Sequence, residues 1–105
     1  MTKTYVEVNG TSYNSDTDPE VIRVLENCRI NRTRIILDYG DTKTGVSWGE
    51  EHDITGYVGR STGPTKIPLV IWNSRSYGGG SLLSHCVVGI KTARGKVPLY
   101  TWGKK

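Results

Sequence analysis

The chain has 105 residues, and its 14 basic against 10 acidic side chains leave a net charge of +4. This length suits one domain covering residues 1–105, and no apolar run approaches the ~20 residues that a membrane-spanning helix needs. We therefore expect a single domain without a membrane segment. Because the N-terminus lacks an apolar signal core, we also expect a cytoplasmic protein with reduced cysteines.

The N-terminal segment predicts a β-hairpin. Alternating side chains over Thr4–Val8 are followed by Asn9-Gly10, and the extended pattern resumes over Thr11–Tyr13. Asn-Gly between extended runs is the strongest short hairpin signal, because both residues tolerate the positive φ of a type I′ turn.

A helix from about Asp18 to Ile30 follows. Either Asp18 caps it with Pro19 as the first helical residue, or Thr17 and Glu20 form a capping box. Four apolar side chains recur at helical spacing and form one stripe: Val21, Ile22, Leu25 and Cys28. The opposite, solvated face is expected to carry Arg23, Glu26, Asn27 and Arg29.

The rest of the chain predicts strands and loops. Pro68 favours an edge or strand-start position, because proline cannot donate to a neighbouring strand. The expected fold class is α+β: an antiparallel β-sheet with an N-terminal hairpin and one helix packed across the sheet. The expected strands are Arg34–Tyr39, Val46–Trp48, Ile54–Arg60, Ile67–Trp72, Ser81–Thr92 and Val97–Trp102.

Three loops are richer in Gly, hydroxyl groups and Arg than turns require: Gly40–Gly45, Gly56–Lys66 and Asn73–Ser81. Glycines let successive backbone N–H groups point into one anion-binding concavity, arginine forks match phosphate oxygens, and aromatic rings stack on bases. This pattern indicates a nucleotide or diphosphate site. Its candidate residues are Tyr57, Arg60, Ser61, Thr62, Trp72, Asn73, Arg75, Ser76, Tyr77 and Gly79.

A simpler interpretation stands beside this one. Gly- and Ser-rich segments between strands are usually turns, and none of the three loops matches a P-loop or a dinucleotide-binding fingerprint. The basic cluster of Arg29, Arg32 and Arg34 is expected to be solvated at the helix C-terminus, where cations are favoured.

The sequence gives little support to an enzyme. His85 and Cys86 are neighbours in an expected strand, so their side chains would point to opposite faces. Glu50, Glu51 and Asp53 have the chemistry of general acids and bases, but a solvated acidic loop explains them as well. Two histidines and two cysteines lack metal-ligand spacing, so we expect no catalysis, no metal and no cofactor.

The three loops, with Trp48 and Lys66–Pro68, resemble those of small phage and prophage proteins, and in particular the anti-Thoeris nucleotide sponges. The resemblance covers roughly Asp18 to Thr92. It implies a non-catalytic homo-oligomer that binds cyclic ADP-ribose isomers made by host immune enzymes and withholds them from their effector in the infected cell's cytoplasm.

Two other functions fit the same sequence. A single-stranded nucleic-acid binder would stack bases on Trp48, Trp72 and the tyrosines, and its affinity would fall steeply with salt. A phage inhibitor of a host protein would use exposed aromatic side chains at the interface and would need no small-molecule ligand.

Overall fold

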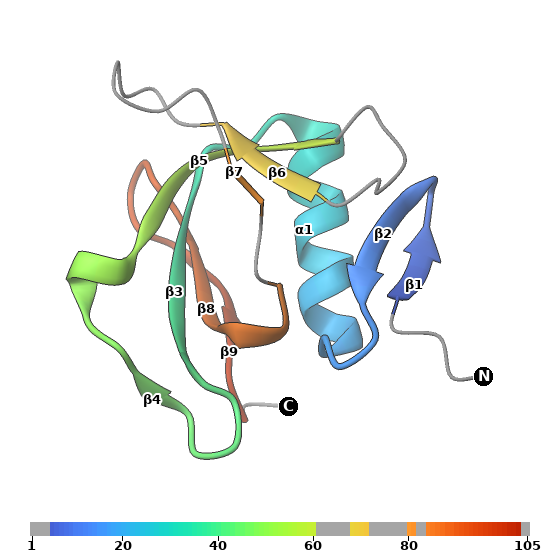
Figure 1. Ribbon diagram of the computed structural model, residues 1–105. Helices are drawn as coiled ribbons and strands as arrows, with labels where there is room; N and C mark the ends of the chain where they lie inside the picture. The colour runs from blue at the N-terminus through green and yellow to red at the C-terminus, as the bar shows by residue number, and fades with distance from the viewer. Residues whose placement is uncertain (1–4, 61–67, 72–79, 82–83, 104–105) are drawn as a thin grey trace.

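The computed structural model describes residues 5–60, 68–71, 80–81 and 84–103. One helix, α1 (Pro19–Asn31), lies between a two-stranded hairpin and a larger antiparallel sheet (Figure 1). This arrangement confirms the expected α+β fold, with one helix packed on a sheet and a hairpin at the N-terminus. No helix in the described part of the chain is long and apolar enough to cross a membrane.

The hairpin is formed by β1 (Tyr5–Val8) and β2 (Thr11–Asn14), with Val8 paired to Thr11. Asn9 and Gly10 both have positive φ, 52° and 79°, as the predicted type I′ turn requires.

The helix begins in the first of the two ways that the sequence predicts, with Asp18 as its cap. Asp18 is the N-cap: its carboxylate accepts a hydrogen bond from the Glu20 backbone N–H at 2.9 Å, and Pro19 follows as the first helical residue. Thr17 is instead buried, and its hydroxyl lies 2.7 Å from that of Ser84. The second carboxylate oxygen of Asp18 accepts a hydrogen bond from Tyr100 Oη at 2.8 Å, which ties the start of the helix to the sheet.

The larger sheet has the strand order β7-β6-β5-β3-β8-β9, with β4 paired to β3. Every pairing between these strands is antiparallel. Pro68 begins its strand, as predicted. The strands are β3 (Ile35–Asp41), β4 (Val46–Ser47), β5 (Ile54–Arg60), β6 (Pro68–Ile71), β7 (Gly80–Ser81), β8 (Val87–Thr92) and β9 (Pro98–Thr101).

One predicted strand is too long. The range Ser81–Thr92 was expected to be extended throughout, but Ser84–Cys86 forms a 3₁₀ turn and β8 begins only at Val87. The turn buries Ser84 against Thr17, a contact 67 positions away in sequence that local periodicity does not reveal. A second 3₁₀ turn, Glu50–His52, precedes β5.

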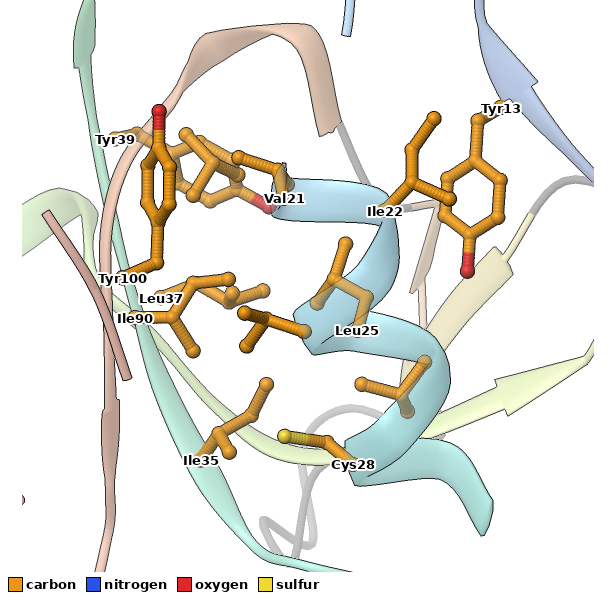
Figure 2. Close-up of a cluster of buried hydrophobic side chains, with 13 residues drawn as sticks. Tyr13, Val21, Ile22, Leu25, Cys28, Ile35, Leu37, Tyr39, Ile90 and Tyr100 are labelled. Carbon is orange, nitrogen blue, oxygen red and sulfur yellow. The ribbon is translucent and has the colours of Figure 1, made fainter. Parts of the chain in front are cut away.

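The core lies on both sides of α1 (Figure 2). Leu25 and Val21 pack toward Leu37 and Ile90 of the sheet, whereas Tyr13 of the hairpin lies beside Ile22 on the other side of the helix. Because both sides belong to one cluster, the hairpin is part of the core.

Candidate functional site

The part of the chain that the structure describes holds a hollow of about 590 Å³ between the end of α1 and strand β5. It is lined by Arg29, Arg32, Tyr57, Val58 and Gly59. Two guanidinium groups thus share one concave surface with an aromatic ring and a glycine. That combination suits a ligand with both a negative charge and a flat ring.

The end of the helix positions the two arginines. Arg32 adopts a left-handed conformation (φ 54°, ψ 44°), and its backbone N–H bonds to the carbonyl of Cys28. The N–H of Thr33 reaches the same carbonyl at 3.0 Å. This turn ends the helix and leads into β3. Helix C-termini carry partial negative charge, which the nearby cations offset.

Strand β5 supplies the aromatic ring. Gly56 of β5 pairs with Ile35 of β3 on one side, and Tyr57 pairs with Ile71 of β6 on the other. At this point β5 is therefore held by a neighbouring strand on each side. Its side chain is 37 % exposed, which leaves ring surface for a ligand. Val58, the next residue, is buried in the core and anchors the strand.

Arg29 is not solvated at the helix end, contrary to the prediction. It forms an ion pair with Glu26, in which Arg29 Nη2 donates to the carboxylate at 2.8 Å and Nε donates at 3.3 Å. The prediction for Glu26 was also wrong, because this side chain is buried rather than on a solvated face. The hairpin folds back over that side of the helix, where Tyr13 Oη and Asn9 Nδ2 donate to the same carboxylate.

These contacts fix the charge state of the pair. Burial is the strongest single influence on Glu26 and acts to raise its pKa, but hydrogen bonds from Arg29, Tyr13 and Asn9 together leave the pKa below its usual value. The bond to Glu26 raises the pKa of Arg29. Both groups are therefore ionised at neutral pH.

The structure describes only some of the residues that the sequence predicts to form the ligand site. Tyr57 lines the hollow, and Arg60 ends β5 opposite Pro68. The remaining predicted residues lie outside the described ranges: Ser61, Thr62, Trp72, Asn73, Arg75, Ser76, Tyr77 and Gly79. Arg29 and Arg32 were not predicted as site residues, although the clustering of basic residues at this point of the sequence indicates a site for an anion.

The loop Gly40–Gly45 is a hairpin turn between β3 and β4. The N–H groups of Thr44 and Gly45 bond to the carbonyl of Asp41, and that of Lys43 bonds to the Asp41 carboxylate. Trp102 Nε1 donates to the carbonyl of Thr42 at 2.7 Å. Because three backbone N–H groups are already used, this loop supports the simpler turn interpretation.

The acidic loop is solvated only in part. Glu50 and Glu51 are exposed, as expected, but one carboxylate oxygen of Asp53 is buried without a hydrogen-bond partner in the described structure. Burial and the nearby Asp38 raise the pKa of Asp53, and Lys91 opposes them. Among the described residues, no three or more His, Cys, Asp or Glu side chains are grouped so as to hold a metal ion.

The prediction that His85 and Cys86 lie in a strand was wrong. These residues lie in the 3₁₀ turn before β8 and not in a strand, so alternation of strand faces does not apply to them. Both cysteines are free, as expected, and burial raises the pKa of each thiol. A raised pKa keeps a thiol protonated, which makes it a poor nucleophile.

The features that define this site are therefore the two arginines at the end of α1, the buried Glu26 behind one of them and the exposed ring of Tyr57. No known protein family, curated protein or solved structure matches the chain.

Proposed function

We propose that the protein binds and sequesters a small nucleotide-type anion in the hollow between α1 and β5, without catalysis. The observation that carries the proposal is the convergence of Arg29, Arg32 and Tyr57 on one surface. Guanidinium groups match phosphate oxygens, and an exposed tyrosine ring offers a stacking surface for a base.

The size of the hollow supports a ligand of this class. Small-molecule sites commonly enclose ~300–1,000 Å³, and the hollow measures about 590 Å³. The resemblance to anti-Thoeris sponges makes cyclic ADP-ribose isomers the first ligands to test. Each carries a diphosphate with two negative charges and an adenine ring, so it can contact the arginines and the tyrosine at the same time.

Sequestration also suits the chemistry of the site. Holding a ligand requires complementary charge and shape but no activated nucleophile, and burial raises the pKa of the Cys28 and Cys86 thiols, which favours their protonated, weakly nucleophilic form. We further propose that the protein works as a homo-oligomer, because a neighbouring subunit that closes the hollow would bury more of the ligand.

The test is calorimetric titration of the purified protein with cyclic ADP-ribose isomers. Replacing Arg32 by Ala removes one charge-assisted contact at an exposed position, so we expect affinity to fall about three- to tenfold. Tyr57→Ala removes the stacking surface and should cost about tenfold. Arg94→Ala is the matched control, because Arg94 is an exposed arginine in the turn between β8 and β9, outside the lining of the hollow.

The remaining sequence-predicted residues enter the same experiment. Arg75→Ala and Asn73→Ala are expected to weaken binding roughly ten- to a hundredfold if these loops contribute to the site. Mass spectrometry of ligand released on heating should recover it uncleaved. Unchanged affinity in Arg32→Ala and Tyr57→Ala would show that the hollow is not the site, and cleaved ligand would indicate an enzyme.

A further inference from the structure

The ion pair between Glu26 and Arg29, of which only Arg29 lines the hollow, joins three parts of the molecule. Glu26 of α1 accepts hydrogen bonds from Asn9 in the hairpin turn at 3.2 Å, from Tyr13 in β2 and from Arg29 one helical turn further on. Its side chain is only 6 % exposed. The carboxylate is therefore held in place on several sides, and its negative charge is screened little by solvent.

Two of the three guanidinium nitrogens of Arg29 are used by Glu26. Arg29 Nε and Nη2 donate to Glu26, whereas Nη1 makes no hydrogen bond within the described residues. Arg29 also lines the hollow. The guanidinium thus contacts the internal carboxylate through Nε and Nη2 and leaves Nη1 unused by it.

Glu26 offsets part of the positive charge of the hollow. Arg29 and Arg32 line the hollow, whereas Glu26 does not line it but is ion-paired to Arg29, so these three side chains together carry a charge of +1. The low pKa of Glu26 keeps that opposing charge present at neutral pH. An anion in the hollow is attracted by two guanidinium groups and repelled by a buried carboxylate directly behind one of them.

We propose that Glu26 is a specificity-determining residue of this hollow, a buried counter-charge that removes much of the affinity advantage that polyphosphates would otherwise have over ligands with one or two negative charges. This inference rests on the proposed function, because it concerns the same hollow. Its physical basis is that repulsion from Glu26 grows with each charge added to the ligand and so offsets part of the attraction to Arg29 and Arg32, which grows in the same way. ATP therefore gains little affinity over a cyclic diphosphate nucleotide from its additional charges.

The experiment compares AMP, ADP, ATP and a cyclic ADP-ribose isomer at one ionic strength without Mg²⁺, by calorimetry. For the native protein, affinity should change by less than about threefold for each phosphate added from AMP to ATP. In Glu26→Gln the opposing charge is gone while an oxygen acceptor remains. Relative to the native protein, affinity should then rise by about three- to tenfold for each negative charge on the ligand. ATP should therefore show the largest gain.

The same helix offers a matched control. Glu20 and Arg23 form an ion pair with the same spacing, Arg23 Nε to Glu20 at 2.6 Å, but both side chains are about half-exposed and neither lines the hollow. Glu20→Gln should leave all four affinities unchanged. A merely structural Glu26 would instead weaken all four ligands equally when replaced, because loosening Arg29 does not depend on ligand charge.

Each outcome decides the matter. An equal loss for every ligand in Glu26→Gln, or no change, overturns the role of Glu26. If that variant does not fold, the native series alone is decisive, because a rise of about tenfold for each phosphate would show that no counter-charge acts. If binding depends on Arg32 but affinity rises about tenfold for each added phosphate, the role of Glu26 is contradicted and the proposed function is not. No binding by any of the four ligands contradicts the proposed function as well.

Discussion

At the scale of single residues, the protein carries a carboxylate whose surroundings disfavour its charge. Asp53 has one buried oxygen without a described partner, and burial together with Asp38 raises its pKa. The folded state therefore binds this proton more tightly than the unfolded chain does. It follows that Asp53 contributes most to stability when protonated, and that this contribution is lost as pH rises through the folded pKa.

Asp53→Asn should accordingly stabilise the protein at pH 7, because it removes a charge that the fold disfavours. We expect a gain of about 1 kcal/mol or less, seen as a rise in Tm of a few degrees. The difference should shrink as the pH is lowered toward 4, where the native carboxyl is increasingly protonated. Glu50→Gln is the control, since Glu50 is exposed. Thermal melts at both pH values measure the effect, and a variant equally stabilised at pH 4 would contradict it.

At the scale of elements, two hairpin turns contain glycines with nearly equal positive φ, Gly45 at +81° and Gly95 at +82°. A β-carbon at Gly45 would lie 2.9 Å or less from three ring carbons of Trp102, whereas at Gly95 the nearest atom is Val97 Cγ2 at 3.9 Å. The two positions therefore share the conformational cost of a side chain, and only the first adds a steric clash.

Gly95→Ala should cost about 1–2 kcal/mol from the left-handed backbone alone. Gly45→Ala should cost about 1–3 kcal/mol more, because Trp102 must move and its hydrogen bond to the carbonyl of Thr42 is disturbed. Urea unfolding measures both, and tryptophan fluorescence of the folded state should change only in Gly45→Ala. Equal destabilisation of the two variants would mean that Trp102 moves aside at little cost.

Elements with strong local signals could be predicted from sequence. The Asn9-Gly10 turn and the Asp18-Pro19 start of α1 are set by backbone preferences of the residues themselves; the turn was predicted correctly, and the start is one of the two alternatives predicted. Glu26 could not be placed in this way. Its position on the helix indicates a solvated face, and only the return of the hairpin across that face buries it.

The candidate site, too, could be predicted from the sequence only in part. Tyr57 was predicted from the composition of its segment, but the approach of Arg29 and Arg32 to β5 depends on how the helix crosses the sheet. Residues 57 and 29 are distant in sequence, and neither segment alone specifies their meeting. The loop Gly40–Gly45 had the composition of an anion site, yet its N–H groups close a turn.

At the scale of the whole molecule, α1 is covered on one side by the large sheet and on the other by the hairpin (Figure 1). An isolated two-stranded hairpin is at best marginally stable in water, so this one depends on its contacts with the helix. Tyr13 supplies the largest of them, with a fully buried ring in the shared core and a hydroxyl bonded to Glu26. The hairpin and the sheet should therefore unfold together.

Tyr13→Ala tests this cooperativity, because it removes a buried ring whose loss should cost about 3–5 kcal/mol. Trp48 and Trp102 lie with the β3–β4 hairpin on the large sheet and not in the N-terminal hairpin. If the molecule is one cooperative unit, tryptophan fluorescence and far-ultraviolet circular dichroism will show the same lowered urea midpoint. Tyr13→Phe keeps the ring and removes only the hydroxyl bonded to Glu26, so it should cost less, about 1–3 kcal/mol. A fluorescence midpoint that stays at the native value in Tyr13→Ala, while the hairpin is lost, would show that the sheet and helix fold without it.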